Sequence, residues 1–427
     1  MKLLLFTILF PFFAVSIEPE KLLSLFSSSS TTNDWIEELN SIGACTQPLQ
    51  ELPQETNTLP LFDYYPGLQK LPHISLCTLP TPIKKLNDAG SLLQLPELYV
   101  KDDSVLGFPH YSGNKPRKLE FELARALMHG ASAIVTFGCV GSNHAVATSE
   151  YARLLGMECL CMLQPELNSH DVRNTLLLHS VLGTQLHYYP NSAIRKIGTL
   201  CTWLEYKNKY GTYPYVIPTG GSTPLGVVGF VNAAFELKEQ IDAGIIPKPD
   251  CIYLACGNTV SGATTAGLLL GCKAANLSIH IRPIAVEPED YPGQTKNTIT
   301  TLFKTTNALL HSIDSQFPLY ELTKDDYSID LRFTGIEYAL FTPEGMHAKQ
   351  LMHHAEAITL DGVYTAKAFA AVIADAQQGI LNNKKVLFWN TYSSFDTKRI
   401  QDIDYKELPV CFHAYFEEEV QELDRMS

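Results

Sequence analysis

The sequence predicts an α/β fold with two lobes, each a mainly parallel β-sheet covered by helices. Its 427 residues exceed the size at which a single hydrophobic core stops growing, so two packed domains are expected. From residue 71 onward, short apolar runs alternate with amphipathic segments, the pattern of parallel strands joined by helices. This alternation forms two series. We therefore assign residues 71–118 and 218–427 to a large domain and residues 119–217 to a small domain.

The first series lies between residues 98 and 210. Its short apolar runs predict strands, and its stretches with helical spacing predict helices that end at glycines such as Gly130 and Gly156. In chain order we expect a strand at 98–102, a helix around 119–127, a strand at 133–138, a helix at about 143–155, a strand at 158–164, a helix at 172–183, a strand at 185–190 and a helix up to Tyr210.

The second series begins near residue 214 and continues to residue 390. In chain order we expect a strand at 214–218, a helix at 226–241, a strand at 251–257, a helix at 264–276, a strand at 280–288, helices near 345–357 and 366–380, and a strand at 385–390. Open parallel sheets bind ligands beyond the carboxyl ends of their strands. The loops that follow the strands are therefore where function is expected.

Composition limits the classes of partner. Apolar residues make up 45% and charged residues 18% of the chain, which is ordinary for a globular enzyme and unlike a disordered protein. The formal net charge of −13 argues against a nucleic acid, because nucleic-acid binding depends on clustered Lys and Arg that neutralise phosphates. We expect a small-molecule substrate instead.

The N-terminal residues form a leader and an appendage. The apolar run Leu3–Val15 is too short to span a bilayer, which needs about 20 residues, so no stable membrane span is expected. Residues 1–17 match either a secretory signal or a hydrophobic leader that is not removed, so export and cytoplasmic location both stay open. Residues 18–70 form an appendage with a Ser-rich linker at 27–33 and a short helix at DWIEEL.

Ten cysteines are scattered without a C-x-x-C pair. We expect buried free thiols rather than a disulfide framework, and no metal site. Cys159 and Cys161 alternate as the residues on one face of a strand do.

Three loops after predicted strands carry polar groups. The loop CGNTVSGATTAG at 256–267 combines small residues with a helix start, which suits a phosphate, although a tight turn with helix caps is the alternative. It lacks the lysine of a P-loop and the spacing of a dinucleotide fingerprint. In FGCVGSNHAV, Ser142 or Asn143 could equally cap the next helix. The paired glycines of IPTGGSTPLG also suit a simple turn.

Lys115 is the fourth element of the expected site. It precedes Pro116, a residue favoured in a first helical turn, so its amine lies near a helix N-terminus. The positive potential there disfavours the ammonium form, as a lysine that forms a Schiff base requires. A reactive amine, a phosphate loop and a cluster of hydroxyl and amide groups together point to pyridoxal 5'-phosphate, an aldehyde that carries a phosphate.

These motifs resemble the family of D-cysteine desulfhydrases and 1-aminocyclopropane-1-carboxylate deaminases, pyridoxal-phosphate enzymes of the tryptophan synthase β-like fold type II. The likeness runs from LPTPIKKL at Leu79 to TYSS at Thr391, about three quarters of the chain. It implies a two-lobed fold type II enzyme in which the large domain binds the cofactor, and it implies a homodimer.

The resemblance also implies roles for individual residues. Lys115 in GNKPRKLEF would form the Schiff base, Ser142 in GSNHA would hold the substrate carboxylate, and Asn143 would bond the 3′-oxygen of the cofactor. The catalytic residues would be Lys115, Ser142, Tyr338 and Tyr364, and the cofactor-binding residues would be Lys115, Asn143, Ser261, Gly262, Ala263, Thr264, Thr365 and Thr391.

Two threonines favour one branch of the family. The deaminases carry Glu after the second tyrosine and Leu in the last loop, whereas the desulfhydrases carry Thr at both, as Thr365 and Thr391 do here. A Thr hydroxyl supports the electron sink of the cofactor less than a carboxylate does, which suffices for expelling a good leaving group. We therefore expect a lyase that converts D-cysteine or a similar β-substituted amino acid to pyruvate, ammonia and hydrogen sulfide.

Other functions stay open. They are a 1-aminocyclopropane-1-carboxylate deaminase, another deaminase or racemase of the superfamily, and a non-catalytic relative that binds an amino acid or the cofactor. The base that removes the α-proton would be either Lys115 or one of the two tyrosines.

The sequence departs from the family in several places: a Gln is lost before the S-N pair, DGVY stands where the family has D-P-V-Y, and the last loop carries Tyr392 and Ser393 in place of two glycines, which leaves the size of the substrate open. For the two cations beside Lys115, Arg117 and Lys118, we expect pairing on the helix surface with Glu120 or Glu122.

Overall fold

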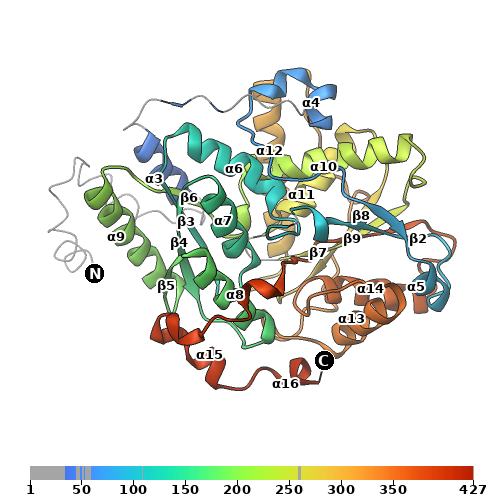
Figure 1. Ribbon diagram of the computed structural model, residues 1–427. Coiled ribbons are helices and arrows are strands. Elements are labelled where there is room, and N and C mark those ends of the chain that lie inside the picture. The colour runs from blue at the N-terminus through green and yellow to red at the C-terminus, as the bar shows by residue number, and fades with distance from the viewer. Residues whose placement is uncertain are drawn as a thin grey trace.

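The computed structural model describes residues 34–44, 49–50, 52, 59–107, 109–257 and 261–426. The expected leader at 1–17 and the Ser-rich linker at 27–33 lie outside the described residues. Two separate sheets form the framework (Figure 1), and helices cover both faces of each, as the sequence predicts. Among the described helices, none is both long and apolar enough to cross a membrane.

The first sheet has five strands in the order β1-β2-β9-β7-β8. All neighbours are parallel except β1 and β2, which pair antiparallel. The strands are β1 (Ile83–Lys85), β2 (Leu98–Asp102), β7 (Cys251–Cys256), β8 (His280–Ala285) and β9 (Val386–Asn390).

Helices cover this sheet on two faces (Figure 1). Ile252 and Leu254 of β7 enter one core together with Phe230, whereas Tyr253 between them enters a second core with Phe369. This alternation is what a strand buried on both faces requires. The first core belongs to α10 (Pro224–Asp242), α11 (Ala263–Ala274) and α12 (Gln294–Ile313), and the second to α5 (Asn87–Leu92), α13 (Pro343–Glu356) and α14 (Thr365–Gln377).

The second sheet has four parallel strands in the order β5-β4-β3-β6. Cys159 and Cys161 of β4 share the core beneath α7 and α8, so they lie on one face of the strand, as predicted. Leu160 and Met162 enter the opposite core with Trp203 of α9. The elements are β3 (Ala133–Cys139), β4 (Glu158–Gln164), β5 (Gln185–Tyr188), β6 (Tyr215–Ile217), α7 (Asn143–Leu154), α8 (His170–Leu182) and α9 (Ser192–Tyr210).

Part of the appendage is built into this second lobe. The expected short helix is α3 (Asp34–Ala44), and its Trp35, Ile36 and Leu39 are buried in the core shared with α9. The Asn40 side chain donates to the Val216 carbonyl at 2.8 Å and accepts from the Val216 N–H at 2.7 Å. Asn40 thereby satisfies backbone groups at the exposed edge of β6, which fixes α3 against the sheet.

The chain after β9 crosses back to the second lobe (Figure 1). Ile400, Leu408 and Phe412 pack into the core beneath α8. The segment contains η5 (Thr397–Ile400), η6 (Tyr405–Glu407), η7 (Val410–Phe412), α15 (Ala414–Glu417) and α16 (Glu422–Arg425). Gln421 of the same segment accepts from the Phe341 N–H at 2.8 Å, so residues after 390 contact both lobes, and the domain boundaries stay a prediction.

Several described elements are not predicted by the apolar pattern, and α12 and β1 are two of them. Helix α12 is rich in Thr and Asn, which have low helix propensity, and β1 is only three residues long. The remaining described helical elements are α4 (Pro60–Tyr64), η2 (Pro66–Lys70), η3 (Asp103–Val105), α6 (Pro116–Met128) and η4 (Thr219–Gly221). All nine cysteines of the described ranges are free thiols, and five of them are buried.

A buried ion network fixes the start of α6. The Arg117 guanidinium donates to Asp103 at 2.7 Å and to Glu236 of α10 at 2.7 Å. The Lys101 amine of β2 donates to Glu236 at 2.6 Å, and the Trp389 indole of β9 donates to Asp103 at 2.9 Å. The network therefore ties α6 to two strands and to α10.

The expected surface pairing of Arg117 and Lys118 is wrong. Both side chains are only 1% exposed. Arg117 pairs with distant carboxylates, and Lys118 donates to the carbonyl of Gly220. Glu120 accepts backbone N–H groups of Leu76 and Cys77 instead. The first turn of α6 points into the molecule, so local spacing on the helix does not decide these contacts.

We expect Arg117→Met to destabilise the protein by about 3–5 kcal/mol, because it leaves two buried carboxylates with one cation between them. The urea midpoint of unfolding measures the loss. Lys85→Met is the matched control, since it breaks an exposed pair with Glu97 at 3.2 Å that is worth at most about 1 kcal/mol. Equal shifts for the two variants would contradict the importance of the network.

Candidate active site

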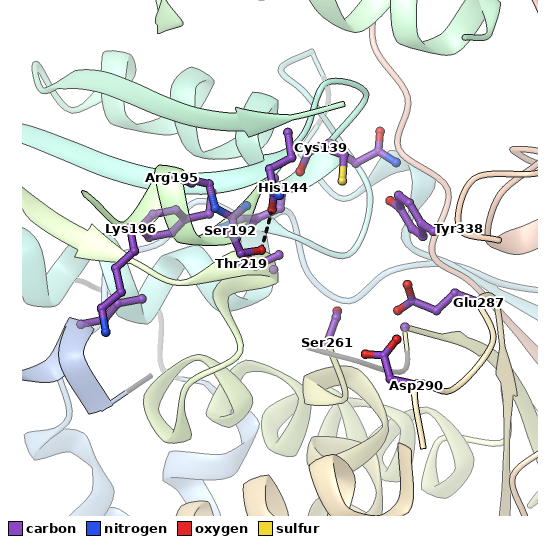
Figure 2. A pocket seen from close by; sticks show the side chains of 18 of the residues that line it. Cys139, His144, Ser192, Arg195, Lys196, Thr219, Ser261, Glu287, Asp290 and Tyr338 are labelled. Carbon is purple, nitrogen blue, oxygen red and sulfur yellow. Dashed lines mark hydrogen bonds between the residues drawn. The ribbon is translucent and has the colours of Figure 1, made fainter. Parts of the chain in front are cut away.

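A cavity of about 670 Å³ lies between the two lobes. Its wall includes Phe137 and Cys139 from the end of β3, Gly257 after β7 and Glu287 after β8. The cavity is therefore at the carboxyl ends of parallel strands from both sheets, where the fold class places ligands. Figure 2 shows the side chains that point into it.

Lys115 contributes the amine of this cavity. It stands at the N-cap position of α6, with Pro116 at the first helical position. Its Nζ donates to Asn114 Oδ1 at 2.6 Å and lies 6.0 Å from the centre of the Tyr364 ring. Burial lowers the pKa of Lys115 to about 8, although the carboxylate of Asp361 opposes this effect. A substantial fraction of the amine is thus neutral near physiological pH.

The loop before α11 lies next to this lysine. Ser261 lines the cavity, Gly262 is the N-cap residue of α11, and Ala263 begins the helix. The Thr264 hydroxyl accepts from Asn114 Nδ2 at 3.2 Å. The first N–H groups of α11 lack intrahelical partners, so this end of the cavity suits an anion. Residues 258–260 lie outside the described part of the chain.

Ser142 and Asn143 line the cavity at the start of α7. Ser142 caps the helix, because its hydroxyl accepts from the Ala145 N–H at 3.2 Å. Asn143 Oδ1 accepts from the Tyr111 hydroxyl at 2.5 Å. Ser142 therefore both caps α7 and lines the cavity.

Tyr338 and Tyr364 face each other in the cavity wall, with 2.6 Å between their hydroxyl oxygens. Burial raises the pKa of both phenols well above the usual value, and the nearby Glu166 carboxylate raises both further. Both phenols therefore stay protonated at neutral pH and can donate hydrogen bonds. The backbone N–H of Tyr364 donates to Asp361 at 2.6 Å, which fixes the turn before α14.

Comparison with protein families decides what this arrangement is. A family model described as pyridoxal-phosphate dependent enzyme matches residues 74–391. The chain belongs to this family. Pyridoxal phosphate is therefore its cofactor, and the expected two-lobed fold type II architecture is confirmed.

Relatives with two different names are similar to this chain over most of its length. A putative 1-aminocyclopropane-1-carboxylate deaminase of Pyrococcus horikoshii is 32% identical over 326 residues, which are 76% of this chain and 92% of the relative. A D-cysteine desulfhydrase of Salmonella typhi is 31% identical over 331 residues, which are 76% of this chain and 94% of the relative.

Two solved structures share the fold. The crystal structure of an ACC deaminase homologue superposes with a TM-score of 0.65 at 30% identity, covering 78% of this chain and 95% of the other. A pyridoxal 5'-phosphate-dependent aspartate racemase gives a TM-score of 0.51 at 14% identity, covering 82% and 99%, which shows the fold alone.

The residues of the cavity fit pyridoxal phosphate. The cofactor needs a neutral amine for its aldehyde and an anion site for its phosphate. Lys115 offers the amine, and the loop before α11 offers the anion site. Asn114 joins the two, because its side chain accepts from Lys115 and donates to Thr264.

Thr365 and Thr391 are not part of the cavity wall. The Thr365 hydroxyl donates to Asp361 Oδ2 at 2.6 Å and accepts from the Asp361 N–H at 2.9 Å. Thr391 follows β9 directly and is 8% exposed. Their role as cofactor ligands stays a prediction.

Several wall or support residues are not predicted by the sequence, among them Asn114, Glu287 and Asp290. The position of Asn114 could have indicated a role in the site, because it immediately precedes Lys115 in the GNK motif. Glu287 and Asp290 line the cavity after β8, where a rule that examines every polar residue beyond a strand would find them. Figure 2 shows both carboxylates on the side of the cavity that holds Tyr338.

We expect the pH dependence of cofactor uptake to report the lowered pKa of Lys115. Only the neutral amine attacks an aldehyde, so the rate should rise about tenfold per pH unit and level off above about 8. Visible absorbance of apo-protein mixed with pyridoxal phosphate measures the rate. An ordinary lysine, for which Nα-acetyl-lysine is the control, continues to gain rate up to about pH 10. The same profile for the protein would contradict the lowered pKa.

Proposed function

We propose that this enzyme is a lyase that eliminates the β-substituent of D-cysteine or a similar amino acid and releases pyruvate, ammonia and hydrogen sulfide. The observation that carries the proposal is that one cavity holds the Lys115 amine, which is partly neutral near physiological pH, together with the protonated phenols of Tyr338 and Tyr364. This set can accept a proton from Cα and donate hydrogen bonds elsewhere on the substrate.

Lys115 is the better base of the candidates. Accepting a proton requires a group that is deprotonated near neutral pH, and the pKa of Lys115 is about 8. Burial keeps both tyrosines protonated, so Tyr338 and Tyr364 act as hydrogen-bond donors. Bound pyridoxal phosphate supplies the electron sink that stabilises the negative charge left on Cα.

The loops hold the two anionic groups. Ser142 and the N-terminus of α7 would receive the substrate carboxylate, and Ser261, Gly262, Ala263 and Thr264 would receive the phosphate of the cofactor. Asn143 is held by Tyr111 and faces the same cavity, which supports its expected bond to the 3′-oxygen of the cofactor.

The identity of the substrate rests on Thr365 and Thr391. The relatives carry both names, so similarity alone does not choose between a desulfhydrase and a deaminase. Expelling sulfide requires less activation from the cofactor than opening a cyclopropane, and a threonine at position 365 supplies less activation than the carboxylate of the deaminases does.

We expect cofactor-loaded protein to release equal amounts of sulfide and pyruvate from D-cysteine. L-cysteine and 1-aminocyclopropane-1-carboxylate are offered in parallel, and both products are quantified. Lys115→Ala should lower kcat by at least about 10²–10⁴-fold, the usual contribution of a positioned base. Lys84→Ala, an exposed lysine, is the control. Turnover of the cyclopropane acid to 2-oxobutyrate would make the enzyme a deaminase, and binding without turnover would favour a non-catalytic relative.

We expect Tyr338→Phe and Tyr364→Phe each to lower kcat by about 10- to 100-fold while cofactor binding persists. Each variant removes a donor and leaves the other buried hydroxyl without its partner at 2.6 Å. Steady-state kinetics and cofactor absorbance separate the two effects. Tyr320→Phe, outside the cavity, is the control. Full activity in both cavity variants would remove the tyrosines from the mechanism.

We further propose a homodimer as the assembled state, on the basis of the family resemblance and the frequency of twofold pairs among oligomers. Sedimentation of the purified protein decides this point.

A further inference from the structure

The cavity continues beyond the reacting groups into a region that the mechanism does not use. We call this region the cationic annex and define it by Trp35, Phe137, Arg195 and Lys196, all of which line the same cavity as Lys115. Figure 2 shows Arg195 and Lys196 on one side of the cavity and Tyr338, Glu287 and Asp290 on the other. Positive and negative groups thus occupy opposite ends.

The two cations of the annex lie against aromatic rings rather than carboxylates. The Arg195 guanidinium lies 5.3 Å from the centre of the Phe137 ring, and the Lys196 amine lies 5.3 Å from the Trp35 ring. Burial lowers the pKa of both cations. Within the described ranges, neither cation makes an ion pair, although the charge of Glu38 opposes the lowering of the pKa of Lys196. Partly desolvated cations that make no ion pair with a carboxylate are suited to an anion supplied by a ligand.

Arg195 lies near the loop that is expected to hold the substrate. The Phe137 ring beneath the Arg195 guanidinium belongs to β3, and the end of β3 leads directly into the loop that carries Ser142 and Asn143. A substrate held by its α-carboxylate at this loop would therefore bring a longer β-substituent within reach of the annex.

One of the four annex residues, Trp35, comes from outside the region shared with the family. The family model begins at residue 74, whereas Trp35 belongs to α3. The helix α3 therefore lies before the residues that the family model matches. Asn40 holds α3 to β6 by two hydrogen bonds, which gives the added wall a fixed position.

We propose that the cationic annex binds a carboxylate or sulfonate at the far end of the β-substituent, so that the preferred substrates are β-substituted amino acids with an acidic leaving group. The proposal rests on the proposed lyase function and deepens it. Glu287 and Asp290 repel such a group from the opposite end, which orients the substituent toward Arg195 and Lys196.

The reaction balances without a further co-reactant. Lys115 accepts the α-proton, the bond between Cβ and sulfur breaks, and the electron pair leaves with sulfur as a thiolate. The proton from Lys115 returns to the thiolate through solvent. One water hydrolyses the remaining 2-aminoacrylate to pyruvate and ammonia.

The test compares S-carboxymethylcysteine with S-carbamoylmethylcysteine, a neutral analogue of nearly the same shape, as separate D and L enantiomers. We expect the acid to exceed the amide in kcat/KM by about 10- to 100-fold in the cofactor-loaded enzyme, the range for a hydrogen bond to a charged group. Arg195→Gln and Lys196→Gln should each bring this ratio closer to one. A ratio of two rates is independent of the fraction of protein that folds.

Lys209→Gln is the matched control. Lys209 lies on the same helix, and its amine also lies over an aromatic ring, 4.7 Å from the centre of Tyr210, but it is exposed and outside the cavity. It should keep the wild-type ratio. If Lys209→Gln lowers the ratio of kcat/KM for the acid and the amide as much as Arg195→Gln does, the preference comes from general surface charge, and the proposal of an anion-binding annex is overturned.

The outcomes separate the two proposals. Turnover of cysteine with equal rates for the acid and the amide overturns the annex and leaves the lyase intact. If neither compound is turned over, the cofactor-loaded protein is titrated with the same two compounds in a calorimeter. Tighter binding of the acid that is lost in Arg195→Gln supports the annex, while the lyase proposal fails. Equal binding, or none, overturns the annex.

Discussion

The position of the reactive amine depends on the buried ion network around Arg117. Lys115 stands at the N-cap position of α6, and the side chain two residues later anchors that helix to Asp103 and Glu236. Burial alone raises the pKa of Glu236, but Arg117 and Lys101 reverse this effect and lower it to about 2. The lowered value means that Glu236 contributes stability above its ordinary pKa and loses it as the pH falls toward 2.

The same anchoring joins the elements that are expected to bind the cofactor. Asn114 contacts Lys115 on one side and Thr264 of the phosphate loop on the other, while Lys118 donates to Gly220 in the paired-glycine loop. A Cβ on Gly220 would lie 3.1 Å from Ser261 Oγ, so the small residue lets these two loops approach. One helix start therefore fixes the Lys115 amine, the loop before α11 and the paired-glycine loop relative to one another.

Local patterns predict most strands and helices, because the spacing of apolar residues that defines each element is visible in neighbouring positions of the sequence. Cys159 and Cys161, two residues apart on one face of a strand, are an example. The loops after strands likewise predict Lys115, Ser142 and Ser261 as neighbours of one cavity. Contacts between distant segments are not predicted: the pairing of Arg117 with Glu236 spans 119 residues, and the docking of Asn40 on Val216 spans 176. Such contacts depend on the assembled fold, and no spacing within either segment reports them.

The three neighbouring cations of the GNKPRK motif differ in their protonation behaviour, and burial combined with the available partners explains the pKa shift of each. Arg117 keeps its charge, because two carboxylates offset the cost of burial and a guanidinium does not deprotonate in this range. Lys118 donates to a carbonyl and, within the described residues, makes no ion pair, and burial together with the neighbouring Lys115 lowers its pKa well below the usual value. Burial lowers the pKa of Lys115 and the carboxylate of Asp361 raises it, and together they leave the pKa at about 8.

A group that must accept and release a proton in turn needs a pKa near the pH of its surroundings. The motif therefore combines a permanent charge for anchoring with a titratable amine for chemistry, and exchanging Arg for Lys at position 117 would give up the fork of donors on which the anchor depends.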